Sequence, residues 1–393
     1  MEGQTAGVVR RPRDRKARIV AAAAAQFHER GYHRVTMEDI AAAVGVTVAA
    51  VYRHFQNKSD LLAGVVLGGI ELFTEAVETS TGHLDDMLRT LAHLAMERRE
   101  LGTLWRRESR YLPAPERERA RSLLWDCATR VTTAVRDARP ELADRDADLL
   151  AWTVLSVLAG PSTRALQMPR RKGEQFLHQT TARVCARYQP PPEPAATSTP
   201  ETSGAPPLRP VTRREALLAV AVDLFGQHGY EAVSMADIGA AAGVTGASVY
   251  KHFAVKADLL AALAHRAIEG HALELSRALT ASSTAPEALT HLLRSKVGLT
   301  LAHPALTAVL VTEADHLPTP HRDAVEQALQ DYLAEWAHLL HLCRPQLAKA
   351  ERRGLVGAVI SVIQTLGVAP HLRARPGFDQ DLITLGAHIL DHG

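Results

Sequence analysis

The sequence predicts an all-α protein made of two related helical units in tandem. Alanine and leucine are abundant, aromatic residues make up only 5% of the 393 residues, and alternating runs of Val, Ile and Thr are scarce. That composition favours helices over strands. The segment Val35–Leu62 returns at Val233–Leu260, 198 residues later, with 18 of 28 aligned positions identical. We therefore expect one local structure to form twice.

The first unit opens with a basic segment and a helix. Six basic residues fall between Arg10 and Arg18. Directly ahead of the repeated segment, they suit phosphate or minor-groove contact as well as a solvated face. Apolar residues at helical spacing predict a helix from about Asp14 to Arg30, ended by Gly31. The apolar run Ile19–Ala25 is too short for a secretory signal peptide.

The repeated segment predicts two short helices around a tight turn. Thr36 begins the first helix, and Asp39 three residues later completes a capping box. Gly45 supplies the turn, because glycine adopts the required backbone angles without strain. Thr47 begins the second short helix, which we expect to extend through Phe55. A longer helix then starts at position 58.

The remainder of the chain repeats this plan. Residues 189–210 hold eight of the 21 prolines and predict a semi-extended linker. Arg139–Gly160 aligns with Arg344–Thr365 at an offset of 205, so the duplication covers whole units. The expected domains are two short-helix domains at 13–62 and 211–260, helical domains at 63–188 and 261–393, and the linker between the units.

Two short helices at this spacing form a helix-turn-helix, whose second helix enters the major groove of DNA. Small residues at its start allow close approach to the bases. Flanking hydroxyls and cations suit phosphates, as do the helix starts at Lys58 and Lys256. The candidate DNA contacts are Arg13, Arg15, Lys16, Thr36, Thr47, Val48, Ala49, Ala50, Tyr52, Arg53, His54 and Lys58 in the first unit, and Ser234, Thr245, Gly246, Ala247, Ser248, Tyr250, Lys251, His252 and Lys256 in the second.

The motif residues form a pattern that resembles the TetR family of bacterial transcriptional regulators. It reads Phe-x-x-x-Gly-Tyr, then Val-Thr-x-x-Asp-Ile-Ala-x-x-x-Gly-Val-Thr, then Val-Tyr-x-His-Phe-x-x-Lys-x-x-Leu-Leu. The second copy departs by placing Gly239 where the family has alanine. The two-unit arrangement is similar to a tandem form of the family in mycobacteria.

The resemblance implies a repressor that a small apolar effector releases from DNA, with lipid, sterol and acyl-CoA as suggested classes. It also implies an intrachain pseudo-dimer, formed by Asp146–Gly160 and Gln175–Arg187 against Ala350–Gly367 and Asp379–Asp391. The operator should be asymmetric, because Val48, Ala50 and Arg53 differ from Gly246, Ser248 and Lys251.

Aromatic and charged residues of the first helical domain are candidates for the effector site. The candidate pocket residues are Trp105, Tyr111, Trp125 and Trp152, each of which fits an ordinary core position as well. The basic run from Arg106 to Arg110 suits either an acidic effector or an interdomain surface.

Several other classes of protein are disfavoured. Cys127, Cys185 and Cys343 lie far apart without metal or redox spacing, as expected of small core residues in a reducing cytoplasm. No phosphate-binding glycine loop, nucleophile motif or metal-spaced histidine set predicts an enzyme, a cofactor or a metal. No apolar run reaches the roughly 20 residues that span a bilayer.

We therefore expect a cytoplasmic, nucleoid-associated regulator that binds double-stranded DNA and no membrane. The net charge of +2 is too small to indicate nucleic acid by itself. Two alternatives stay open: a ligand-responsive module that acts through a protein partner, and a homodimer of whole chains.

Overall fold

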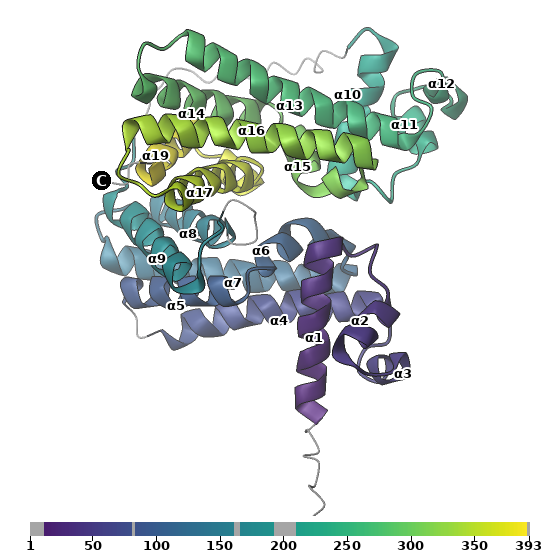
Figure 1. Ribbon diagram of the computed structural model, residues 1–393, viewed down its shortest axis with the longest axis horizontal. Helices are drawn as coiled ribbons and strands as arrows, with labels where there is room; N and C mark the ends of the chain where they lie inside the picture. The colour runs from purple at the N-terminus through teal and green to yellow at the C-terminus, as the bar shows by residue number, and fades with distance from the viewer. Residues whose placement is uncertain (1–11, 81–82, 161–165, 192–209, 391–393) are drawn as a thin grey trace, which may run out of the picture.

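The computed structural model describes residues 12–80, 83–160, 166–191 and 210–390, with side chains from residue 15 onward. All regular elements in these ranges are helices (Figure 1), which confirms the predicted fold class. The first unit contains α1 (Pro12–Arg30), α2 (Met37–Val44), α3 (Val48–Tyr52), α4 (Lys58–Thr79), α5 (Leu84–Glu97), α6 (Leu101–Thr103), η1 (Leu104–Glu108), η2 (Ser109–Tyr111), α7 (Ala114–Ala138), α8 (Asp144–Leu158) and α9 (Arg170–Arg187).

The second unit repeats this order with small changes. It contains α10 (Arg213–His228), α11 (Met235–Ala241), α12 (Gly246–Tyr250), α13 (Lys256–Thr280), α14 (Ala285–Ala302), α15 (Pro304–Glu313), η4 (Ala314–His316), α16 (Thr319–Cys343), α17 (Lys349–Gly367), α18 (Pro370–Arg373) and α19 (Phe378–Leu390). Most of the predicted linker, residues 192–209, lies outside the described residues.

Each repeated segment covers a small core of its own. In the first unit the buried side chains include Ile19, Phe27, Ile40, Val51 and Phe55. In the second unit the matching places, 198 residues later, hold Leu217, Phe225, Ile238, Val249 and Phe253. Apolar spacing along α1 to α4 therefore predicts which faces turn inward in both copies.

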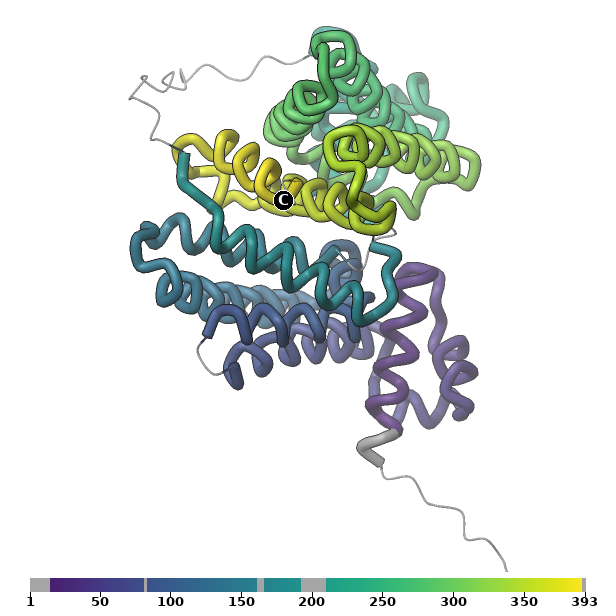
Figure 2. Tube along the Cα trace, turned by 60° about the vertical axis from the view of Figure 1, so that its left-hand side comes forward, coloured from purple at the N-terminus to yellow at the C-terminus, as the bar shows by residue number. Residues whose placement is uncertain are grey.

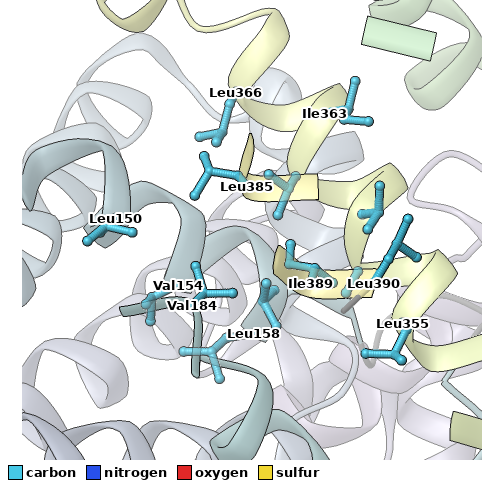
Figure 3. Packing of buried hydrophobic residues seen from close by; sticks show 14 of the residues in the cluster. Leu150, Val154, Leu158, Val184, Leu355, Ile363, Leu366, Leu385, Ile389 and Leu390 are labelled. Atoms are coloured by element: carbon cyan, nitrogen blue, oxygen red, sulfur yellow. The ribbon is translucent and has the colours of Figure 1, made fainter. Parts of the chain in front are cut away.

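The largest core crosses the boundary between the units. Helix α8 packs against α17, and α9 packs against α19 (Figure 2). Figure 3 shows the buried side chains of this contact: Leu150, Val154, Leu158 and Val184 from the first unit, and Leu355, Ile363, Leu366, Leu385, Ile389 and Leu390 from the second. These four helices make up most of the four segments that the family resemblance brings together. Burying apolar surface stabilises the contact by about 25 cal/mol per Å².

One helix end and two domain boundaries differ from what local sequence suggests. Helix α3 ends at Tyr52 and does not continue through Phe55. Phe55 is 3% exposed, and the chain must turn there to bury the ring before Asn57 caps α4. The predicted domain boundaries after residues 62 and 260 fall inside α4 and α13. Each short-helix domain, which we call a head, therefore shares one continuous helix with the helical domain behind it.

Within the described ranges, no single helix has both the length and the apolar character to cross a bilayer. Ala285–Ala302 together with Pro304–His316 reaches that length and composition, but the two parts are bent by 94°.

Two glycines test the contact between the units. A Cβ placed at Gly354 on α17 lies 2.8 Å from Cζ of Phe176 on α9, whereas a Cβ at Gly298 on α14 meets nothing within 4 Å. Gly354→Ala should lower the free energy of unfolding by about 1–3 kcal/mol through overpacking. Gly298→Ala should raise it by up to about 1 kcal/mol through helix propensity. Urea denaturation measures both, and equal changes would contradict the packing described.

Candidate nucleic-acid interface

Helices α2 and α3 form the helix-turn-helix of the first unit. The Thr36 hydroxyl accepts from the backbone N–H of Asp39, and the Asp39 carboxylate accepts from the N–H of Thr36, as the capping box predicts. Gly45 ends α2 with φ of 71°, in the left-handed region that favours glycine. These two local devices fix the angle at which α3 leaves α2.

The second unit builds the same motif from α11 and α12. Ser234 and Asp237 repeat the capping box, and Gly243 takes φ of 69°. The turn chemistry predicted from the repeat is therefore confirmed in both copies.

Helices α3 and α12 are the second helices of the two motifs, and we call them the reading helices. Each has an exposed tyrosine at its end, followed by an exposed cation. Tyr52 and Tyr250 are 49% and 56% exposed, although both are large aromatic residues. Arg53 and Lys251 follow them on the surface. Such an exposed hydroxyl and cation suit phosphate oxygens and base edges.

The candidate contacts at the start of α3 and α12 differ in how exposed they are to solvent. Thr47 and Thr245 are exposed, and their hydroxyls make no capping bond, so they can donate to a phosphate. Ala50 is only 5% exposed, because it lies on the face of α3 that packs inward beside Val51. The prediction that Ala50 contacts DNA is corrected accordingly. The remaining candidates are exposed or half-buried: Val48, Ala49 and His54 in the first unit, and Gly246, Ala247, Ser248 and His252 in the second.

Lys58 and Lys256 have a structural role at the base of each head, and their predicted contact with phosphate stays a prediction. The Lys58 Nζ lies 3.0 Å from the carbonyl oxygens of Tyr32 and Val35, and 4.4 Å from the centre of the Tyr32 ring. Lys256 makes the same contacts with Tyr230 and its loop, at 2.7 and 2.8 Å to the carbonyls. Each ammonium thus holds the loop before α2 against the start of α4, or the loop before α11 against the start of α13. Burial lowers the pKa of both lysines.

The hydroxyls of Thr36 and Ser234 are occupied within their capping boxes, and their predicted contacts with DNA stay predictions. Thr36 and Ser234 donate their hydroxyl hydrogens to Asp39 and Asp237, 3.0 and 2.6 Å away. A hydroxyl has one hydrogen to give, so neither can donate a second bond to a phosphate.

The basic segment is described only from its later part. The side chain of Arg13 lies outside the described residues, and that of Arg15 is exposed. Lys16 Nζ lies 5.4 Å above the Phe55 ring, and Arg214 stands 5.1 Å above Phe253 at the same place in the second unit. Both heads therefore carry a cation over the aromatic ring that closes the reading helix.

A polar cluster joins the two units behind the heads. Arg110 forms an ion pair with the carboxylate of Glu313, which is fully buried, and its Nη2 donates to the Thr312 carbonyl at 2.7 Å. Arg107 pairs with Asp315 at 2.7 Å, and Arg34 donates to the Asp315 carbonyl at 2.6 Å. The basic run from Arg106 to Arg110 thus faces the other unit, as one of its two interpretations predicted.

Aromatic rings complete this cluster. Tyr111 stacks on Tyr32 with ring centres 5.6 Å apart, and its hydroxyl lies 3.2 Å from Nε2 of His316. His316 stacks on Tyr230, and its Nδ1 lies 3.0 Å from Glu231. The loops that precede both helix-turn-helix motifs therefore meet in one network. Sequence reasoning missed it, because most of its contacts join residues far apart in the chain.

The four residues predicted to line an effector pocket do not share one site. Tyr111 belongs to the cluster between the units, and Trp105 packs against the first head's core. Trp125 is 44% exposed and lies 5.1 Å from Trp152, where both rings meet His371 of the second unit. The predicted pocket is therefore wrong as a single group.

The cysteines show no chemistry beyond packing in the part of the chain that is described. All three are free, with Cys127 and Cys185 buried and Cys343 half-buried. Burial raises the pKa of the Cys127 and Cys185 thiols to about 12. No group of three or more His, Cys, Asp or Glu with metal-binding geometry occurs among these residues.

Fold and surface together define a helix-turn-helix DNA-binding regulator with two heads. The family model described as bacterial regulatory proteins, tetR family, matches residues 19–65 and 217–263. A second model, tetracyclin repressor-like C-terminal domain, matches residues 81–188. The chain belongs to the TetR family of DNA-binding transcriptional regulators, which are not enzymes.

Similar proteins match over parts of their length. The HTH-type transcriptional regulator TtgR of Pseudomonas putida is 43% identical over 51 residues, 13% of this chain and 24% of that protein. An uncharacterised HTH-type transcriptional regulator of Mycobacterium tuberculosis is 32% identical over 96 residues, 23% of this chain and 46% of that protein. The chain thus matches less than half the length of these relatives.

Solved structures are matched over nearly their whole length, but over less than half of this chain. A TetR-family transcriptional regulator from Bordetella parapertussis aligns with a TM-score of 0.43 at 17% identity, over 45% of this chain and 94% of that one. The ketosteroid transcriptional regulator KstR2 of Mycobacterium tuberculosis aligns with a TM-score of 0.39 at 22% identity, over 46% and 95%.

Substitutions of Lys58 and Lys251 should have different effects on stability and on DNA binding. Lys58→Met should lower the free energy of unfolding by about 1–3 kcal/mol, because it leaves loop carbonyls without their donor. Lys251→Met should leave stability within about 0.5 kcal/mol and weaken DNA binding. Thermal unfolding and fluorescence anisotropy with duplex DNA measure the two effects. A Lys58→Met variant with unchanged stability but weakened DNA binding would show that Lys58 acts mainly through a phosphate.

The cluster between the units should loosen in acid. Burial lowers the pKa of His316 to about 4 and also lowers the pKa of His33. An unfolded histidine titrates near 6.5, so the unfolded state takes up protons first as the pH falls. This stabilisation is present above about pH 6.5 and is lost as the pH falls toward about 4. His316→Gln should therefore flatten the pH dependence of the urea midpoint across this window.

An exposed histidine on α16 supplies the control. His338→Gln should keep the wild-type slope, since His338 lies on the surface away from the cluster. An unchanged slope in His316→Gln would show that the pH dependence arises elsewhere.

Proposed function

We propose that the chain acts as a single-chain pseudo-dimer that reads an asymmetric operator and is released from it by a small apolar effector. The observation that carries the proposal is a contact between equivalent residues. Ser361 Oγ on α17 donates to the Ser156 carbonyl on α8 at 2.9 Å, and these positions correspond at the repeat offset of 205. A residue that meets its own counterpart lies close to a two-fold axis.

The heads are placed to act together. In Figure 1, α2 and α3 lie toward the same end of the molecule as α11 and α12. The cluster around Arg110, Tyr111, Glu313 and His316 ties the loops before both motifs to one network. Dimeric helix-turn-helix proteins read half-sites about 34 Å apart, which requires a fixed relation between the heads.

The exposed residues of the two heads support unequal half-sites. Arg53 carries a planar guanidinium that can bind guanine through two hydrogen bonds, whereas Lys251 offers a point charge. Val48 presents an apolar side chain where Gly246 has none. Because Ala50 is buried, we assign the difference in specificity to the two position pairs 48/246 and 53/251.

Binding-site selection with random duplexes tests this assignment. Wild-type protein should select two unlike half-sites. The double substitution Gly246→Val with Lys251→Arg should shift selection toward a palindrome of the first half-site, changing affinity by roughly 5- to 150-fold per mismatched base pair. A Cβ at Gly246 meets its nearest atom at 3.8 Å, an ordinary contact, and the first head carries Val48 at this position.

Two outcomes would contradict the proposal. Palindromes selected by wild-type protein would show that the heads read the same bases. An affinity for DNA that stays flat between about 50 and 200 mM salt would argue against binding through several phosphates, and would favour action through a protein partner.

A further inference from the structure

One side of the contact between the units places large side chains of the first unit over glycines of the second. Helix α9 brings Phe176 so close to α17 that a Cβ at Gly354 would lie 2.8 Å from its Cζ and 3.0 Å from Cδ1 of Leu166. Gly357, one turn further along α17, lines the same small space as these residues. The surface of the second unit is therefore hollow where the first unit projects its larger side chains.

The opposite side of the contact has the reverse distribution of sizes. The buried positions of α9 recur in α19 at the offset of 205, so this offset also relates the last helices of the two units. It pairs Gly354 with Leu149, Gly357 with Trp152, Phe176 with Asp381 and Leu166 with His371. The rings of Trp152 and His371 meet with centres 5.3 Å apart, as expected for the equivalent side of a two-fold contact. On this side the first unit carries the larger residues on α8, and the second unit has an aspartate in place of the phenylalanine.

Two first units do not fit together at this surface. By the same two-fold relation, Phe176 of each copy would lie against Leu149 of the other instead of against glycine. The space at Gly354 is already too small for an added Cβ, so a leucine there would overpack the contact. The clash would occur twice, once on each side of the axis.

Two second units would fit poorly for the opposite reason. Each would place Asp381 opposite Gly354 and leave the hollow of α17 unfilled. Asp381 is buried, and its carboxylate accepts a hydrogen bond at 2.9 Å from the hydroxyl of Tyr188 in the first unit. The residue of the second unit at the position of Tyr188 is Gly393, so this donor would be lost.

The charges nearer the heads select the same combination. The Arg107–Asp315 pair would become Arg107 beside Arg110 in a pair of first units, because Arg110 corresponds to Asp315. The Arg110–Glu313 pair would become Asp315 beside Glu313 in a pair of second units. Like charges brought together in this way disfavour the wrong partner.

We propose that size and charge together restrict the contact surface of the first unit to a second unit, so that like units do not pair. This inference rests on the pseudo-dimer proposed above and names the partner that its surface accepts. Two whole chains can then associate through this surface only by exchanging units. Every pair of heads held by the contact therefore contains one first head and one second head.

Cutting the linker of the folded chain tests this pairing rule without DNA. A protease recognition sequence inserted within residues 189–210 allows the full-length protein to be cleaved into its two halves. Native mass spectrometry should then find only pairs of one first half with one second half. The same pairs should return after the cleaved mixture is unfolded in urea and refolded, whereas unselective pairing would produce all three combinations.

Substitutions at the glycine test the size complementarity directly. Gly354→Leu places the residue of the first unit and should raise the concentration at which the cleaved halves separate by roughly 5- to 150-fold through overpacking. Adding Phe176→Ala should recover much of this loss, because it removes the ring that the leucine would meet. Gly298→Leu is the control, since Gly298 is exposed and a Cβ there meets nothing within 4 Å. Sedimentation velocity over a dilution series measures all three.

Charge exchange gives a second test at a more exposed place. Asp315, whose side chain is 40% exposed, becomes the residue of the first unit in Asp315→Arg, which should weaken pairing of the cleaved halves. Adding Arg107→Glu should restore it by reversing the ion pair. Circular dichroism of the uncut chain checks the fold of each variant, and the charge exchange decides the question if Gly354→Leu does not fold.

Several results would overturn the proposal. Like pairs that form on refolding would do so, as would a Gly354→Leu chain that folds and pairs as tightly as wild type. A defect of Gly354→Leu that Phe176→Ala leaves unchanged would contradict the size rule. Wild-type halves that separate completely on cleavage would refute the pseudo-dimer itself, whereas like pairs would refute only the choice of partner.

Discussion

The apolar contact of α8 with α17 is the constraint on which the arrangement of the whole chain depends. Leu150, Val154, Leu355 and Ile363 are each fully buried in it, so the two units share one core instead of resting on a polar boundary. Interfaces between covalently linked domains are usually more polar and permit relative motion. A shared core prevents the two units from moving relative to each other. Contacts nearer the heads therefore form between surfaces whose relative position is already fixed.

The polar cluster behind the heads shows what two units in one chain can do that two identical subunits cannot. At the offset of 205, Arg110 corresponds to Asp315 and Tyr111 to His316. In a homodimer both copies of the position would carry the same residue, and a cation would have an identical cation at its symmetry mate. Joined units can differ, so Asp315, the counterpart of Arg110, pairs with Arg107 and accepts from Arg34 through its carbonyl. The Arg110–Glu313 pair does not need this divergence, because Glu313 corresponds to Glu108. The charge complementarity at Asp315 therefore depends on the duplication having diverged.

Local chemistry explains which features the sequence could predict. Some features involve residues only a few positions apart and can be recognised in the sequence. They are the capping box at Thr36, the turn at Gly45 and the apolar spacing of α1 to α4. The role of Lys58 depends on carbonyls 23 and 26 residues earlier, and that of Tyr111 on His316, 205 residues away. Composition carries no information about such pairs. A usable signal was present, since both copies keep a tyrosine 26 positions before the lysine.

The glycine that departs from the family pattern gives the second head a different shape. A Cβ at Gly239 would lie 3.1 Å from the Val244 carbonyl and 3.1 Å from the Val249 side chain, whereas Ala41 fits at the matching place in the first head. An alanine at position 239 would therefore require the Val244 carbonyl or the Val249 side chain to shift by a few tenths of an ångström. Glycine lowers the helix propensity of α11 but avoids this close contact. The two heads consequently differ in their packing at this position as well as in the residues they expose.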